Sequence, residues 1–204
     1  MEIRKTKLKN MNYELRIRKI KQLLPIVLLI SMAIVERLWW DLGPNIELVT
    51  LATFIAAFYL SRKAAVFIGI SALVLSDIFI GNTNIALFTW SAYAVIALGA
   101  GFLRQFGKTA NKKIFWATGG GILASLWFYV WTNFGVWLLD GYGMYPDTLN
   151  GLAQSYINGL PFLKLQLTGN LLIIPTGFGL IEIIKNLNQI KKFNHINLHG
   201  RLRI

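Results

Sequence analysis

Residues 124–138 read ASLWFYVWTNFGVWL, an apolar run that also carries Ser125, Thr132 and Asn133. Leu, Ile and Val alone would satisfy a lipid-facing helix, so a simple membrane anchor needs neither this amide nor the three tryptophans of the run. An amide buried in hydrocarbon costs several kcal/mol unless it finds a hydrogen-bond partner. We therefore expect Asn133 to face other helices or a cavity, which requires a bundle of several membrane helices.

The composition of the whole chain also indicates a multi-pass membrane protein. Hydrophobic residues make up 55% of the 204 positions, and the mean hydropathy of +0.52 is too high for a soluble domain of this size. Cysteine is absent, and both histidines, His195 and His199, lie in the polar C-terminal tail. We therefore expect no disulfide, no thiolate or histidine metal site in the membrane, and no cofactor.

Six apolar segments lie between two basic ends. The predicted transmembrane helices cover residues 22–38, 46–60, 64–80, 85–103, 114–139 and 165–184. A basic arm at 1–21 precedes this all-α membrane domain (22–184), and a basic tail at 185–204 follows it. Residues 61–63 and 81–84 are predicted to be tight turns. Residues 140–164 are predicted to be a long loop that contains a short surface helix and acts as a lid.

The distribution of basic residues predicts the orientation. With six spans both termini lie on one side, together with 19 of the 21 Lys and Arg residues, and the other side keeps only Arg37 and Lys164. The positive-inside rule then predicts a multi-pass protein of the cytoplasmic (inner) membrane with cytoplasmic N- and C-termini. The basic arm is expected to lie against anionic lipid, and nucleic-acid binding is the less favoured alternative.

Polar side chains gather in the outer third of the predicted bundle. Asp77 lies about one turn from the outer end of the third span, and Asn133 and Asn170 lie one to two turns inside the fifth and sixth. Intramembrane polar groups at one depth predict an outward-facing site. Each has a structural alternative. Asp77 could pair with Arg37, the two amides could bond across helices, and the outer tryptophans could form an interfacial belt.

Five motifs carry a resemblance to a known family. They are Pro44-Asn45, LSDIFIG at 75–81, TNFGVW at 132–137, Tyr145-Pro146 followed by Leu160-Pro161-Phe162, and Gly169-Asn170-Leu171. In this order and spacing they resemble a family of uncharacterised bacterial six-helix integral membrane proteins. That family is similar to the substrate-binding S components of energy-coupling factor (ECF) transporters. The resemblance implies an S-component-like bundle that works with a separate transmembrane coupling protein and cytoplasmic ATPases.

The leading hypothesis is a membrane-embedded substrate-binding subunit that captures a small vitamin-like or other partly apolar solute from the outer face. Its predicted substrate-binding residues are Asn45, Asp77, Asn133, Trp137, Tyr145, Tyr156 and Asn170. Asp77 would set the charge preference, the amides would orient polar edges, and the aromatic rings would stack on the solute.

Other function classes have weaker support in the sequence. The chain has no Gly-x-x-x-x-Gly-Lys-Ser/Thr phosphate loop, so ATP hydrolysis would need separate subunits. We expect no enzyme, because no Ser-His, Asp-Asp or zinc pattern occurs in the membrane segments. The alternative that stays open is a structural or assembly subunit of a larger membrane complex, with no ligand of its own.

Overall fold

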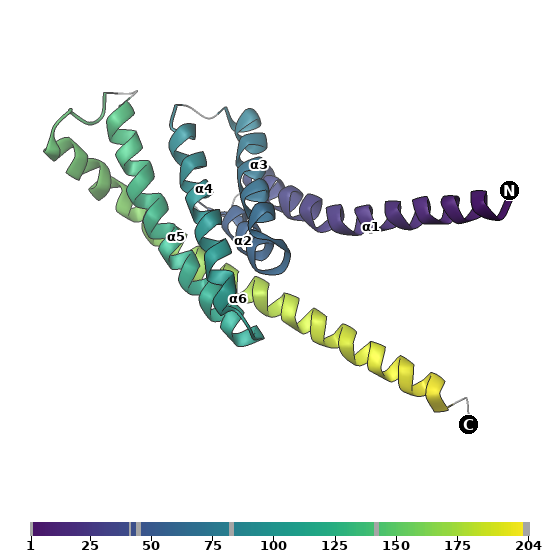
Figure 1. Ribbon diagram of the computed structural model, residues 1–204. Coiled ribbons are helices and arrows are strands. Elements are labelled where there is room, and N and C mark those ends of the chain that lie inside the picture. Colours follow the sequence, from purple (N-terminus) through teal and green to yellow (C-terminus); the bar gives the residue numbers. More distant parts are fainter. Residues whose placement is uncertain (1, 41, 44–45, 82–83, 141–142, 202–204) are drawn as a thin grey trace.

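The computed structural model describes residues 2–40, 42–43, 46–81, 84–140 and 143–201, and every regular element in these ranges is a helix. In chain order these are α1 (Glu2–Val35) with the π-helical segment η1 (Glu36–Trp40), α2 (Leu48–Ile55) with the π-helical segment η2 (Ala56–Leu60), α3 (Arg62–Ile80), α4 (Ala86–Leu103) with the 3-10 turn η3 (Arg104–Phe106), α5 (Ala110–Leu139) and α6 (Leu149–Arg201). The N-terminal part of α1 and the C-terminal part of α6 project beyond the bundle (Figure 1).

Five helical stretches are long and apolar enough to cross a membrane, as expected of a multi-pass membrane protein. They are Tyr13–Trp40, Arg62–Ile80, Ala86–Phe106, Ala110–Leu139 and Leu149–Ile190. The second predicted span corresponds to a shorter apolar helix, Leu48–Leu60. At about 1.5 Å per residue this helix is about 20 Å long, whereas the hydrocarbon core of a bilayer is about 30 Å thick.

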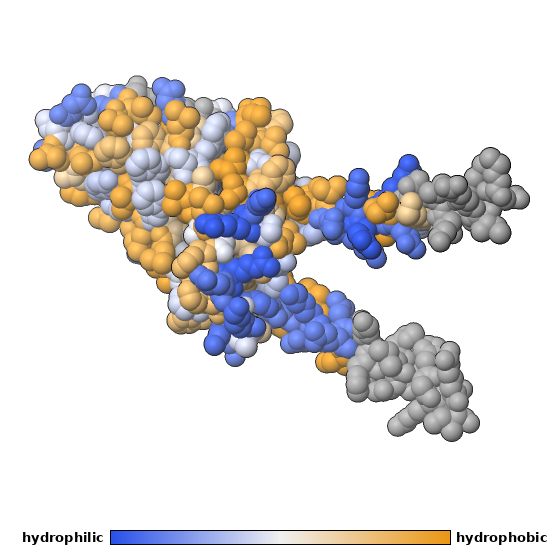
Figure 2. All heavy atoms as spheres, in the orientation of Figure 1, coloured by the Kyte–Doolittle hydropathy of each residue, from blue (hydrophilic) through white to orange (hydrophobic). Residues whose placement is uncertain are grey.

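Alanines are numerous in the core of the bundle, beside a few large side chains such as Phe54 and Phe178, and many large apolar side chains lie on its surface. Ala52, Ala56 and Ala57 of α2 and η2 are fully buried, and their small side chains allow close helix packing. By contrast, Phe79 is 75% exposed and Phe115 70%. This distribution is typical of helices that pack closely in lipid, where hydrocarbon solvates the large residues. Hydrophobic residues cover much of the visible face of the bundle, and hydrophilic ones lie at its lower end, along its upper edge and on the projecting helices (Figure 2).

Local capping groups set where the helices begin and end. The Ser61 hydroxyl accepts a hydrogen bond from the Ala64 N–H at 3.0 Å and starts α3, and Thr148 similarly caps α6 through the Gly151 N–H at 3.1 Å. Gly81 ends α3 in the left-handed region, with φ of 74°. As a result the α3–α4 and α5–α6 connections lie at one end of the bundle, opposite the α2–α3 and α4–α5 connections (Figure 1).

The long loop predicted at residues 140–164 is wrong in its extent, and a lid role for this segment stays a prediction. The connection is limited to residues 140–148, and α6 then runs from Leu149 to Arg201 through Pro161 and Pro175, so the sixth predicted span is part of a longer helix. The reason is a row of small residues that is buried every four positions: Gly151, Ser155 and Gly159. Ser155 and Gly159 lie against Asn133 of α5, and Gly151 lies against Pro146 of the connection. The row thus lets α6 pack closely on the connection and on α5, and α5–α6 is the most extensive helix pair of the bundle. Close packing therefore outweighs the local turn signals of glycine and proline.

Candidate functional site

Arg37 is the centre of a polar network at the end of the bundle that holds the α3–α4 connection. It lies in η1, and its Nε donates to Ser76 Oγ at 2.8 Å, its Nη1 to Glu47 Oε1 at 2.5 Å and its Nη2 to Asp77 Oδ1 at 2.9 Å. The Arg37 side chain is only 11% exposed. All three nitrogens of the planar guanidinium have a partner, so the network ties the end of α1 to α3 and to the segment before α2.

Asp77 uses both of its carboxylate oxygens inside the protein. Arg37 donates to one oxygen, and Trp90 Nε1 of α4 donates to the other at 2.7 Å. A carboxylate in the last turn of a helix is disfavoured by the helix dipole, and these two donors offset that cost. The pairing of Asp77 with Arg37, one of the two alternatives left by the sequence, is therefore present. Trp90 is one of the tryptophans for which an interfacial belt was the alternative, and its indole N–H is a donor in the network.

The network holds more acids than cations. A third carboxylate, Glu36, is 2% exposed and accepts the Leu48 N–H at 2.9 Å, beside Glu47. Arg37 forms ion pairs with Glu47 and Asp77. Within the described ranges, no other Lys or Arg forms an ion pair with any of the three acids. Because buried charges need opposite charges nearby, this excess favours a further cation or a proton. Glu47 is the accessible acid, since its side chain is 27% exposed.

Four predicted site residues lie at the end of the α5–α6 helix pair that holds the α5–α6 connection. They are Asn133, Trp137, Tyr145 and Tyr156. The Tyr156 hydroxyl donates to the Val130 carbonyl at 3.1 Å, and Trp137 Nε1 donates to the Pro146 carbonyl at 3.1 Å. Asn133 donates to a carbonyl of its own helix at 2.8 Å, and the Tyr145 hydroxyl accepts from Asn158 at 3.3 Å. Each of these polar side chains thus has a partner within the helix pair and its loop.

Asn170 lies deeper in the same helix pair. Its Nδ2 donates to Ser125 Oγ at 2.9 Å, and both side chains are buried. This is the bond across helices that the sequence left open as a structural alternative. Asn45, the remaining predicted site residue, lies outside the described residues.

The structure places the described site residues in two groups on either side of α4. Trp90 of α4 reaches Asp77 on one side, and Ser91 of α4 accepts from Trp131 of α5 at 2.8 Å on the other. Among the described residues, no hydrogen bond or ion pair joins Asp77 directly to the α5–α6 group. Contact of either group with a solute stays a prediction.

The Asn170 bond leads to a testable expectation. Replacing Asn170 by alanine should lower the free energy of unfolding by about 1 kcal/mol, because the interhelical bond is lost while Ser125 keeps its own bond to the α5 backbone. Unfolding in detergent, followed by tryptophan fluorescence, measures this change. Thr168→Ala is the control, since this exposed hydroxyl bonds only within α6. An equal loss in both variants would contradict a specific role for the Asn170 bond.

Sequence reasoning missed two features of this end of the bundle. One is Glu47. It belongs to the polar cluster that follows the first predicted span, and this cluster is the sequence feature that could have identified it. The other is a row of aromatic rings along α5: Trp127 and Trp131 stack at 5.6 Å, Trp131 and Phe134 at 5.9 Å, and Phe134 and Trp137 lie 5.7 Å apart. The spacing of three or four residues along a helix could have predicted this row.

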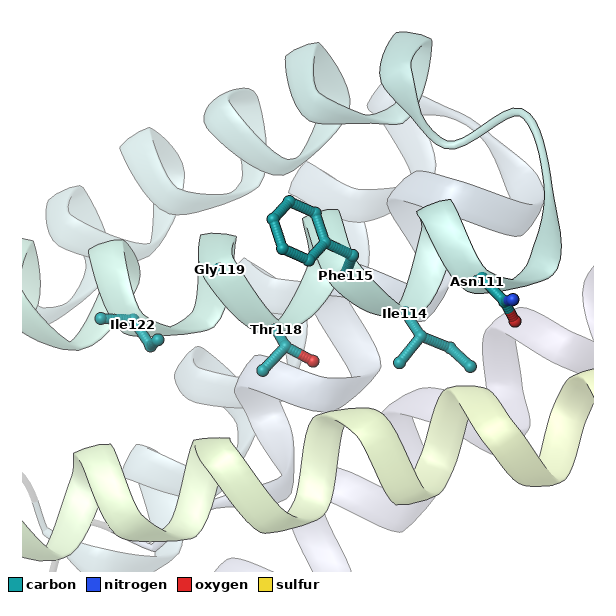
Figure 3. Close-up of a pocket in the computed structure, with 6 residues that line it drawn as sticks. All are labelled: Asn111, Ile114, Phe115, Thr118, Gly119 and Ile122. Atoms are coloured by element: carbon teal, nitrogen blue, oxygen red, sulfur yellow. The ribbon is translucent and has the colours of Figure 1, made fainter.

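Two apolar grooves lie on the sides of α5 and away from both groups. One, of about 500 Å³, runs along a single face of α5 (Figure 3) and is lined by Asn111, Ile114, Phe115, Thr118, Gly119 and Ile122. The other, of about 370 Å³, lies between α4 and α5, with Phe54 and Trp127 among its walls. Their apolar linings suit hydrocarbon better than a polar solute. Within the described ranges, no three His, Cys, Asp or Glu side chains come close enough together to hold a metal ion.

Comparison with known proteins gives one match. Residues 18–193 match a family described as "family of unknown function (DUF6580)", so the match extends over the whole helix bundle. No curated protein and no solved structure matches the chain.

Proposed function

The chain belongs to the DUF6580 family, and we propose that it is a membrane-embedded subunit that captures a small solute from the outer face of the cytoplasmic membrane. The observation that carries this proposal is the excess of buried acids around Arg37, with Glu47 partly exposed at the edge of the network. A solute that carries a cationic group and an apolar part would balance these charges and pair with Glu47.

The proposed orientation follows from the charges of the sequence. Lys and Arg residues are concentrated on the termini and on the loops at the end opposite Arg37. The positive-inside rule makes that end cytoplasmic. If the short helix α2 counts as a span in addition to the five long ones, the number of spans is six and both termini are cytoplasmic. The Arg37 network and the loop at 140–148 then lie at the outer face. Like the S components that the sequence resembles, the chain would pass its solute on with a separate coupling protein and ATPases.

Each group of residues has a distinct role in this proposal. Glu47 contacts the solute, while Asp77 and Trp90 position Arg37 and keep the network charged. The aromatic row of α5 and the residues Asn133, Trp137, Tyr145 and Tyr156 form a second wall on the other side of α4, and Asn170 braces the α5–α6 pair beneath it. Asn45 lies outside the described residues, and its contact with the solute stays a prediction. The polar atoms of this second wall have partners in α5 and α6, so their part in binding is to shape the site and supply apolar ring surface.

The experiment is mass spectrometry of the full chain purified in mild detergent, with any co-purified small molecule identified and quantified. We expect a solute with a cationic group at near-stoichiometric occupancy. Glu47→Gln should lower its occupancy about ten-fold or more, because a charge-assisted hydrogen bond contributes about 1.5–3 kcal/mol. Asp147→Asn removes an exposed acid of the 140–148 loop and should leave occupancy unchanged. The absence of any solute, or equal occupancy in both variants, would overturn the assignment.

A second function, a structural subunit of a larger membrane complex, is favoured by one observation. The described polar side chains of the predicted site all form hydrogen bonds inside the protein. Such a subunit would co-purify with another membrane protein and without a solute. In that case Glu47→Gln would change the stability of the bundle. The variant and the unmodified chain would then carry the same amount of any co-purified small molecule.

A further inference from the structure

A third apolar groove lies at the opposite end of the bundle from Arg37, between α1, α2 and α6. Its volume is about 260 Å³, and it is lined by Pro25 and Leu28 of α1, Ile55 and Leu60 of α2 and η2, and Ile181 of α6, among others. This is below the roughly 300–1,000 Å³ of pockets that enclose drug-sized ligands. The groove therefore suits a single narrow apolar chain better than a bulky solute.

A cation borders the groove. Lys185 of α6 lines it together with Tyr59 of η2, and the Lys185 ammonium lies 4.0 Å from the centre of the Tyr59 ring. The Lys185 side chain is 47% exposed, so its charge stays accessible. Lys21 lies one turn before Pro25 on α1, so by helical spacing a second exposed cation lies on the face of α1 that lines the groove.

Lys185 is a surplus cation at this position. The nearby acid, Glu182, is held by Lys113 at 2.7 Å and by the Tyr59 hydroxyl at 2.7 Å, both on the same oxygen. Lys185 lies 3.9 Å from that oxygen, at the edge of an ion pair. Two lysines thus share one carboxylate, and the more exposed of the two is free to pair with another anion.

An apolar channel that ends at an accessible cation matches an amphiphile with a hydrocarbon chain and an anionic head group. We propose that the groove between α1, α2 and α6 binds one anionic phospholipid, with an acyl chain along Leu28, Ile55 and Ile181 and the phosphate paired with Lys185. Basic sites between membrane helices on the cytoplasmic side bind anionic head groups in this way. The site is separate from the Arg37 network and does not depend on the function proposed for it.

The test measures lipid retention by native mass spectrometry, after the full chain is exchanged from detergent into micelles doped with phosphatidylglycerol or phosphatidylcholine. We expect phosphatidylglycerol to be retained in preference to phosphatidylcholine. Lys185→Gln should reduce phosphatidylglycerol retention about five-fold, the factor for the loss of one lysine near an anionic lipid surface. Lys63→Gln is the matched control, because this exposed lysine lies at the same end and outside the groove, and it should retain lipid as the unmodified chain does.

A second variant tests the apolar half of the site. Ile181→Trp should fill the groove and lower phosphatidylglycerol retention while Lys185 stays in place. Circular dichroism and size-exclusion chromatography establish that each variant is folded, and Lys185→Gln decides the question if Ile181→Trp does not fold. If Lys185→Gln and Lys63→Gln lowered phosphatidylglycerol retention equally, the retention would depend on general surface charge and not on this groove. If phosphatidylglycerol and phosphatidylcholine were retained equally, the groove would have no preference for an anionic head group. Either result overturns the proposal.

Discussion

Replacing Arg37 by methionine should lower the free energy of unfolding by about 3–5 kcal/mol, the cost of removing one partner from a buried ion pair. Methionine keeps much of the apolar stem of Arg37, so the loss is chiefly electrostatic. It leaves Asp77, which is 4% exposed, and Glu47 without their cation. Denaturant unfolding in detergent micelles, followed by tryptophan fluorescence and circular dichroism, measures the change.

Two further variants give this prediction its controls. Arg16→Met makes the same change on an exposed part of α1 and should alter stability by less than about 0.5 kcal/mol. Combining Arg37→Met with Asp77→Asn should recover part of the loss, because the unpaired charge is then removed. A cost below about 1 kcal/mol for Arg37→Met, or no recovery in the double variant, would contradict the central role of the Arg37 network.

Replacing Gly120 by leucine should destabilise the bundle by about 3 kcal/mol, at the upper end of the usual cost of overpacking. A Cβ atom at this position would lie 2.6 Å from Leu103 Cδ1 and would also press against the Phe54 ring. Both neighbours belong to other helices, so the added side chain must push α5 away from α2 and α4. Thermal unfolding in detergent measures the loss of stability.

The neighbouring glycine provides a matched control on the same helix. A Cβ atom at Gly119 would meet nothing within 4 Å. Gly119→Leu should therefore change stability by less than about 0.5 kcal/mol, and leucine also favours the helix more than glycine does. If the two leucine variants behaved alike, the packing of α5 in the bundle would differ from the one described here.

The all-helical membrane class was predictable, because it depends on properties that a sequence displays directly. The length of the apolar segments and the turn signals at 61–63 and 81–84 place α3, α4 and α5 where spans were expected. The start of α6 was not predictable from local signals. Pro161 and the glycines around it read as a loop, but Ser155 and Gly159 lie against Asn133 of α5, which is 22 residues before Ser155 and so outside the reach of local signals.

The candidate site could be predicted in position but only partly in its contacts. Depth along each span indicated that Asp77 and Asn133 lie toward one end, and Arg37 was identified as a partner of Asp77. Asn170 lies deeper than expected, beside Ser125 in the middle of α5, because α6 begins at Leu149 rather than near residue 165. The sequence could not show that one guanidinium is shared between Asp77 and Glu47, since this depends on the path of the chain between α1 and α2. Nor could it show that Asn133 bonds within its own helix, because rotamer choice is decided by the packing of Gly159 against it.

The unbroken course of α6 gives the molecule a mechanical property. A helix of 53 residues is about 80 Å long at about 1.5 Å per residue. It starts at the loop beside Tyr145 and ends in the basic tail, so one continuous helix connects the two ends of the bundle. A tilt of α6 at its Tyr145 end would displace its far end in the opposite direction, and Pro161 and Pro175 are the points where the helix can bend.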